Sequence, residues 1–230
     1  MTLELTVVRV FVGPAGRGGN PLGVFLDGGA VPRDRRQSVA YDLNYSETVF
    51  VDDRAAGRIQ ILTPARELPF AGHPSVGTAW LLRETGTPVE TLRPPAGDVP
   101  VRHDDERTWI AAHPSWVKHA FRFVQLRSAA EVEMFEQPPM GTPGQYVWAW
   151  IDEAAGELRS RSFPTDFGIL EDEATGLAAV MLGGELNRPL TIRQGVGSEI
   201  VVRPWPDGMV EIGGRVELVE TRAEGTGRRD

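Results

Sequence analysis

The part of the chain that decides its fold begins Asn44-Tyr45-Ser46-Glu47-Thr48 and ends Glu67-Leu68-Pro69-Phe70-Ala71-Gly72-His73-Pro74. Glu47 stands directly before an expected strand at residues 48–51, and His73 stands directly before an expected helix. Pro74 opens that helix, because proline is well accommodated at a first helical position. Residues 76–82 are apolar on nearly all sides of the helix, so we expect it to be buried within a sheet. We therefore predict that a carboxylate and an imidazole meet in one cleft.

The composition of the chain excludes several classes of protein. Its 230 residues are 41% hydrophobic, enough for one large domain or two small ones, and 26 Gly and 18 Pro suit short strands and turns. The net charge of −8 and the lack of a dense basic run argue against binding to nucleic acid or to an anionic membrane surface. The absence of cysteine excludes disulfides, thiolate metal sites and cysteine nucleophiles.

The sequence shows no segment for export or for crossing a membrane. The first twelve residues alternate as a strand does and lack the basic start of a signal peptide. No apolar run approaches the roughly 18 residues that a spanning helix needs. We expect a soluble, cytoplasmic protein.

An internal repeat with a period close to one hundred residues indicates two similar halves. The sequence VDDRAAG at 51–57 recurs as IDEAAG at 151–156, and TLR at 91–93 recurs as TIR at 191–193. Gly77-Thr78-Ala79 on the first apolar helix matches Gly176-Leu177-Ala178 on a second. The repeat predicts an α+β fold with two pseudo-symmetric halves, each a bent β-sheet wrapped around a central helix.

The repeat also divides the chain into segments. We expect a first half at residues 1–101, which carries Glu47 and His73, and a second half at 145–220, which carries Asp172. Between them, residues 102–144 form a connecting region in which the pattern weakens. Residues 221–230 read as a disordered tail.

Aligning the two halves brings candidate catalytic groups together. His73, four residues before Gly77, falls opposite Asp172, four residues before Gly176. Both precede a buried helix, where unpaired N–H groups and the helix dipole favour an anion. A cleft between two such helix ends suits a small substrate that carries a carboxylate.

Glu47 has no carboxylate as its counterpart, because it aligns with Val147. An enzyme that inverts a stereocentre with two bases needs an acid/base on each side of the substrate. A single carboxylate suits a base that removes a proton and returns it to another carbon on the same face.

Each of these residues also has a plainer interpretation, and the sequence leaves it open. Glu47 before a strand is compatible with a solvated carboxylate, and His73 before a proline with a helix cap. Asp172, between Glu171 and Glu173, is compatible with an acidic helix-capping cluster. The four histidines show no zinc spacing, and no glycine-rich nucleotide motif is present, so we predict neither a metal nor a nucleotide cofactor.

Together these motifs resemble the PhzF-type isomerases of phenazine biosynthesis. The matching segments cover most of residues 1–100 and about 145–220; they are residues 19–22, 44–48, 63–74, 161–169 and 171–176, and Gln194-Gly195. The resemblance implies a diaminopimelate-epimerase-like fold with the active site between its halves, acid/base chemistry without a cofactor, and a homodimer. In that family the substrate is a dihydro-hydroxyanthranilate, which is isomerised by a proton shift.

The resemblance assigns roles to residues of this chain. Glu47 maps onto the proton shuttle, and His73 and Asp172 onto the groups that bind and polarise the substrate. The candidate substrate-binding residues on the matching motifs are Asn20, Ser46, Gly72, Thr175, Gly176, Gln194 and Gly195.

The chain departs from the family pattern in its second half. Glu173 replaces a proline of the usual motif, and Leu177 replaces a serine whose hydroxyl would contact substrate. Residues 196–199 read VGSE where the family has Met-Gly-Arg-Pro, and the chain is shorter within 101–145. These changes bear on the substrate more than on the reaction type.

The sequence predicts a cofactor-independent isomerase of a secondary-metabolite pathway. In this hypothesis Glu47 moves a proton within a small carboxylate-bearing metabolite, while His73 and Asp172 orient and polarise it. Two alternatives stay open. One is an epimerase or cyclase that uses the same base, and the other is a catalytically silent homologue that only binds a ligand, which Leu177 favours.

Overall fold

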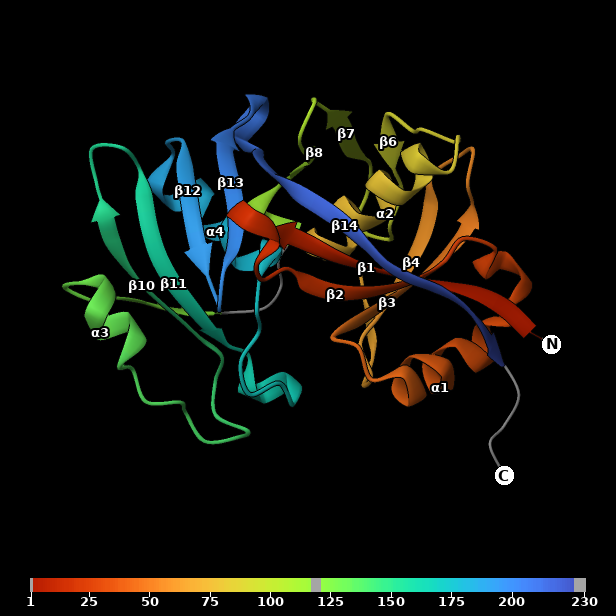
Figure 1. The fold of residues 1–230 in the computed structure, drawn as a ribbon, viewed down its shortest axis with the longest axis horizontal. Coiled ribbons are helices and arrows are strands. Elements are labelled where there is room, and N and C mark those ends of the chain that lie inside the picture. Colours follow the sequence, from red (N-terminus) through yellow and green to blue (C-terminus); the bar gives the residue numbers. More distant parts are fainter. Residues whose placement is uncertain (1, 117–120, 226–230) are drawn as a thin grey trace.

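The computed structural model describes residues 2–116 and 121–225 (Figure 1). These residues form four α-helices: α1 (Arg33–Leu43), α2 (Gly72–Glu84), α3 (Ala129–Glu133) and α4 (Gly176–Leu186). Their strands are β1 (Thr2–Val12), β2 (Asn20–Phe25), β3 (Glu47–Asp53), β4 (Arg58–Leu62), β5 (Glu67–Leu68), β6 (Thr91–Leu92), β7 (Val99–His103), β8 (Thr108–Ala112), β9 (Arg122–Gln125), β10 (Gln145–Asp152), β11 (Glu157–Phe163), β12 (Leu190–Gln194), β13 (Ser198–Pro204) and β14 (Val210–Gly225).

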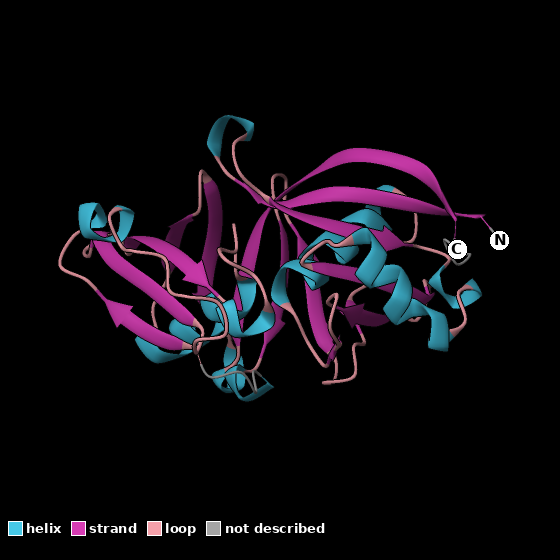
Figure 2. Ribbon diagram, turned by 90° about the horizontal axis from the view of Figure 1, so that it is seen from below, coloured by secondary structure: helices cyan, strands magenta, loops and turns pink. Residues whose placement is uncertain are grey.

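The strands form one continuous hydrogen-bonded sheet that bends around both sides of the molecule. Their order is β5-β4-β3-β2-β1-β14-β13-β12-β11-β10-β9, and β8 pairs with β14 and continues through β7 to β6. The antiparallel strands β1 and β14 join the two sides, as Figures 1 and 2 show. Strands β2 to β7 lie with α1 and α2 on one side, and β9 to β13 lie with α3 and α4 on the other. The predicted α+β class is confirmed.

The two sides repeat the same hairpin. Strands β3 and β4 pair antiparallel with a bulge before the turn, and β10 and β11 do the same. A parallel strand flanks each hairpin, β2 beside β3 and β9 beside β10. The bulges show that Asp53 and Asp152 are equivalent residues of the two hairpins. Counted back along the strands from them, Tyr146 is the residue equivalent to Glu47. The expected counterpart, Val147, is wrong by one residue. The turns Asp53–Arg58 and Asp152–Glu157 are equal in length, so Val51 matches Trp150 and not Ile151.

The two central helices start against each other. Helix α2 contacts β1, β2, β3, β8 and β14, and α4 contacts β13, β14 and α2. Helix α2 begins at Gly72, so Pro74 occupies its third position rather than its first. The N–H of a third helical position also lacks an intrahelical partner, so proline is equally harmless there.

Glycine at both helix starts allows this contact. A Cβ on Gly72 would lie 2.8 Å from the Cα of Gly176, and a Cβ on Gly176 would lie 2.9 Å from the Cα of Gly72. Gly72 and Gly176 are therefore the equivalent residues, and the expected match of Gly77 with Gly176 is wrong. As a consequence Leu177, and not Asp172, is the counterpart of His73.

Two expectations about segments also need correction. Residues 102–144 are more than a connector, because they contain β8, which pairs with β14, and β9 and α3, which pack on β10. Residues 221–225 are not disordered: they end β14 and pair with the start of β1. Residues 226–230, the rest of the expected tail, lie outside the described residues. Within the described ranges, no helix is long and apolar enough to cross a membrane.

Replacing Gly72 with alanine should destabilise the protein by about 1–3 kcal/mol, because the new methyl group must push the two helix starts apart. Urea unfolding of Gly72→Ala measures this loss. Glu185→Ala, at an exposed position of α4, is the control and should unfold like the wild-type protein. An unchanged unfolding midpoint for Gly72→Ala would show that the helix starts have room between them.

Candidate active site

A cavity of about 520 Å³ opens where α2 and α4 begin. Residues from both sides of the molecule line it, and Glu47, His73 and Asp172 are among them. The other lining residues are Ser46, Thr63, Arg66, Glu67, Leu68, Pro69, Phe70, Ala71, Gly72, Trp116, Phe121, Pro164, Asp166, Phe167, Ile169, Thr175, Gly176 and Leu177.

Glu47 is the first residue of β3, and its side chain is only 15% exposed. Its Oε2 lies 3.4 Å from Nε2 of His73. Among the described residues, neither of these two buried atoms has a hydrogen-bond partner. Buried polar atoms are almost always paired, so these two are groups that a ligand can satisfy.

His73 occupies the second position of α2 and is almost completely buried. Its Nδ1 lies 3.5 Å from the side-chain nitrogen of Asn20, on the ring edge opposite Nε2. The imidazole is thereby held from behind and presents Nε2 toward Glu47. It does not cap the helix through its side chain.

Asp172 lies in the loop before α4, and both of its oxygens accept hydrogen bonds. Asn20 Nδ2 donates to Oδ1 at 2.7 Å, and Thr175 Oγ1 donates to Oδ2 at 2.6 Å. Asn20 also donates to the Ala174 carbonyl, and its own Oδ1 accepts from Ser46. Asn20 therefore ties the strand that carries Glu47 to the loop that carries Asp172.

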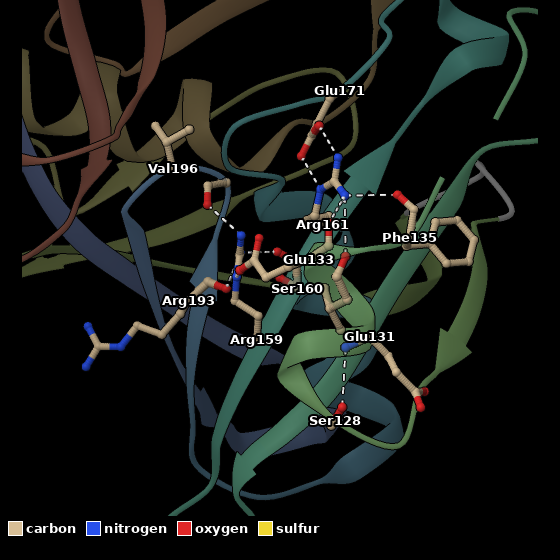
Figure 3. A network of polar contacts seen from close by, with 12 residues as sticks. Ser128, Glu131, Glu133, Phe135, Arg159, Ser160, Arg161, Glu171, Arg193 and Val196 are labelled. Atoms are coloured by element: carbon tan, nitrogen blue, oxygen red, sulfur yellow. Dashed lines mark hydrogen bonds and ion pairs between the residues drawn. The ribbon is translucent and has the colours of Figure 1, made fainter. Parts of the chain in front are cut away.

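The acidic run at 171–173 is not a helix-capping cluster, because its three carboxylates point to different partners. Glu171 forms two hydrogen bonds of 2.8 Å with Arg161 (Figure 3). Glu173 accepts from the backbone N–H of Val196 and from the Ser198 hydroxyl. Asp172 is thus held between two anchored neighbours.

Two arginines of β11 brace this loop from outside the cavity (Figure 3). Arg161 donates to carbonyl oxygens of α3 and the residues after it, including those of Glu133 and Phe135. Arg159 pairs with Glu133 and donates to the Gly195 carbonyl, in the turn between β12 and β13. The guanidinium groups link α3, the Asp172 loop and this turn into one polar network.

The structure brings most of the expected binding residues to the cavity but not all of them. Ser46, Gly72, Thr175 and Gly176 line it. Asn20 lies behind the catalytic candidates, and neither Gln194 nor Gly195 lines the cavity, so the role of these three residues in binding substrate stays a prediction. Gln194 instead donates to the Asp172 carbonyl and to Thr175 Oγ1, and Tyr146 donates to its Oε1. The oxygen and the nitrogen of this buried amide therefore both have partners, and the amide holds the Asp172 loop in place.

Sequence reasoning missed the residues at the mouth of the cavity. Arg66 is the one arginine or lysine among the described lining residues, and its guanidinium stacks 4.4 Å over the ring of Phe167. Phe70 and Trp116 meet edge to face, with 5.8 Å between ring centroids. These side chains come from separate elements without a common motif, so the sequence offered no signal for them.

Burial dominates the electrostatics of the site. It raises the pKa of Glu47 to about 8, with a further rise from the charge of Asp172 and an opposing hydrogen bond from Ser46. Burial also raises the pKa of Asp172 to about 6, against hydrogen bonds from Thr175 and Asn20. It lowers the pKa of His73 to about 3, although a hydrogen bond with the backbone of Pro21 acts to raise that pKa. At pH 7 Glu47 is protonated and His73 neutral, so their contact is not an ion pair.

This arrangement supplies the parts of an acid/base site. Neither α2 nor α4 has a side-chain cap, so their first N–H groups stay available to an anion where the two helices meet. Glu47 holds a proton at a pKa near neutrality, as a general acid or base requires. A carboxylate bound at the helix starts would lie beside that proton.

The comparisons agree with this reading of the fold. The structure resembles that of a PhzF-family phenazine biosynthesis protein from Bacillus anthracis, with a TM-score of 0.81 at 18% identity over 97% of this chain and 99% of that one. It also resembles a hydroxyproline epimerase from Agrobacterium vitis, with a TM-score of 0.65 at 13% identity over 97% and 91% of the two chains. The fold is therefore that of the epimerase-like proteins.

Sequence comparison narrows this class to one family. The family model described as phenazine biosynthesis-like protein matches residues 8–120. Trans-2,3-dihydro-3-hydroxyanthranilate isomerase of Pseudomonas aeruginosa is 31% identical over 92% of this chain and 87% of its own length, and that of Pseudomonas chlororaphis is 33% identical over 90% and 86%. The chain belongs to the PhzF family of isomerases.

Replacing Glu47 with glutamine should stabilise the protein, and the gain should grow with pH. The folded protein keeps the Glu47 proton up to a pKa of about 8, whereas the unfolded chain releases it near 4.5. The stability due to this proton is complete below pH 4.5 and is lost as pH rises through 8, because the unfolded state then binds fewer protons. Glutamine does not titrate, so the Glu47→Gln variant does not lose this stability as pH rises.

Urea unfolding at pH 5, 7 and 9 measures the difference between Glu47→Gln and wild type. We expect the largest gain at pH 9. Glu67→Gln changes an exposed glutamate at the mouth of the same cavity and should show no comparable trend. An equal difference at all three pH values would contradict the raised pKa.

Proposed function

We propose that this protein is a cofactor-independent isomerase that moves a proton within a small, carboxylate-bearing metabolite. Glu47 takes a proton from one carbon of the substrate and returns it to another. His73 and Asp172 orient and polarise the substrate, and the N–H groups at the starts of α2 and α4 bind its carboxylate. Membership in the PhzF family and the named relatives support this reaction type.

One observation carries the proposal. The Oε2 atom of Glu47 is buried and unpartnered among the described residues, and Glu47 lines a cavity where two helix starts converge. Leaving a buried carboxyl oxygen unpaired costs about 1–3 kcal/mol, so its retention here favours use in catalysis over a structural role.

The hydrogen bonding of the two carboxyl groups favours a one-base reaction over a two-base epimerisation. Both oxygens of Asp172 accept hydrogen bonds from Asn20 and Thr175, whereas Glu47 keeps a free oxygen. The residue equivalent to Glu47 in the second half is Tyr146, whose hydroxyl contacts Ser160 and Gln194 away from the cavity. A second free base at the symmetric position is therefore not provided.

We extend the proposal to the setting of the reaction. The phenazine-related relatives support a secondary-metabolite pathway, and the absence of cysteine is compatible with the cytoplasm. The exposed Leu218 and Val219 on β14 offer apolar surface for the homodimer that the family resemblance implies. Light scattering of the purified protein would test the dimer, and a monomer at micromolar concentration would contradict it.

Solvent deuterium should enter the substrate only when Glu47 is intact. The wild-type protein would be incubated in D₂O with trans-2,3-dihydro-3-hydroxyanthranilate and a panel of small unsaturated ring acids, and exchange followed by NMR. Glu47→Gln should lower the exchange rate by about 10²–10⁴-fold, the usual contribution of a general acid/base. Glu185→Ala, at an exposed position of α4 outside the cavity, should exchange like wild type. A Glu47→Gln protein that exchanges label as fast as wild type would falsify the shuttle.

The specificity constant should rise with pH toward a plateau above pH 8. Glu47 must be ionised to accept a proton, and its pKa in the free protein is about 8. Between pH 6 and 7.5, kcat/KM should therefore increase about tenfold per pH unit, since it reports ionisations of the free enzyme. Initial rates between pH 5.5 and 9.5 test this, and a profile that falls over this range would argue against Glu47 as the base.

A further inference from the structure

The two helix starts present unlike side chains to the same cavity. Because Gly72 and Gly176 are in contact, the residues that follow them, His73 and Leu177, occupy equivalent positions. Both side chains line the cavity. One is an imidazole with a free nitrogen, and the other is a hydrocarbon that can neither donate nor accept a hydrogen bond.

Glu47, His73 and Asp172 form one group of polar side chains in the cavity. Asn20 links His73 to Asp172, and Glu47 lies across from the imidazole. The Thr175 hydroxyl stands closest in sequence to Leu177, but its proton is already donated to Asp172 and it accepts from Gln194. It therefore has no proton left to offer a substrate.

Leu177 is one of several apolar lining residues that belong to the main apolar cluster of the protein or pack against it. Leu177 and Trp116 pack against that cluster, and Phe70 and Phe121 are members of it. All four side chains also line the cavity. These side chains can bury a hydrocarbon surface, but they leave a buried hydroxyl or amine unpaired.

We infer that Leu177 determines specificity, and that the substrate is a small ring acid with a hydrocarbon edge against Leu177. The carboxylate lies at the helix starts, the carbon that exchanges its proton faces Glu47, and the opposite edge carries no hydroxyl or amine. This inference rests on the proposed function in taking the cavity as the substrate site. It adds the class of substrate that the cavity selects.

Binding of two inert acids tests the inference without turnover. Benzoate presents a hydrocarbon edge, and 3,5-dihydroxybenzoate presents a hydroxyl whichever way its ring is turned. Titration calorimetry of the wild-type protein should show benzoate binding at least about tenfold more tightly, the lower range expected for an unpaired buried hydroxyl. Leu177→Ser should weaken benzoate binding and strengthen 3,5-dihydroxybenzoate binding, so that the preference shrinks or inverts.

Met181→Ser provides the matched control. Met181 is one turn further along α4, is also partly buried against the apolar cluster and does not line the cavity. The Met181→Ser variant should keep the wild-type preference for benzoate over 3,5-dihydroxybenzoate. Circular dichroism checks that both variants are folded. Equal binding of the two acids by wild type, binding of neither, or an unchanged preference in Leu177→Ser would each overturn the inference.

The result is separable from that of the deuterium experiment. The carbon-bound hydrogens of both acids are aromatic and too weakly acidic for Glu47 to remove, so their binding does not depend on catalysis. A selective cavity without deuterium exchange would refute the proposed reaction and keep the specificity of Leu177. Deuterium exchange without a preference between the two acids would support the proposed reaction and refute the role of Leu177 in specificity.

Discussion

The contact between Gly72 and Gly176 sets the geometry of the site. Because both central helices begin at this point, their unpaired N–H groups and the positive ends of their dipoles converge on one volume. Two like dipole ends repel each other, so the arrangement is costly unless negative charge lies nearby. Asp172 supplies part of that charge within the protein, and an anionic ligand would supply more. The backbone alone would therefore favour a carboxylate at this point.

The side chains around this contact are of two kinds. Some have atoms without a hydrogen-bond partner among the described residues, and others hold the surrounding loop in place through hydrogen bonds. Glu47 and His73 keep unpaired atoms toward the cavity, whereas Asn20 and Gln194 spend their amides on the backbone and side chains of the Asp172 loop. Two residues that replace the family pattern contribute to this support. Glu173 and Ser198 hydrogen-bond to each other, so two separate departures in sequence form a single interaction in space. They preserve the position of Asp172 rather than disturb it.

The sequence was informative where the physical signal was local. The buried helix α2, the strand β3 and the positions of Glu47 and His73 at the starts of these elements all followed from short patterns of apolar residues, glycine and proline. The repeat also predicted two equivalent helices correctly, but it matched Gly77 instead of Gly72 with Gly176. Spacing along the chain does not reveal which backbone atoms are in contact. Gly72 and Gly176 are required because the backbones of α2 and α4 are in contact there.

The same limit applies to the residues around the cavity. Gln194 and Gly195 belong to a recognisable motif, yet their roles depend on the direction of one amide, which is set by Tyr146, Thr175 and the Asp172 carbonyl. Arg66 and Phe167 meet only because two sides of the molecule close on one another. Contacts of this kind arise from long-range packing, and no pattern within a single segment encodes them.

The pairing of β1 with β14 has a consequence for how the protein is made. Thr2 pairs with Gly225, and β14 also forms the hydrogen-bonded neighbour of β8 and β13 and packs on both central helices. During synthesis all of these partners emerge from the ribosome before β14 does. The sheet that joins the two sides of the molecule is therefore complete only after both central helices have been made. It depends on contacts between segments far apart in the sequence, the slowest kind to form.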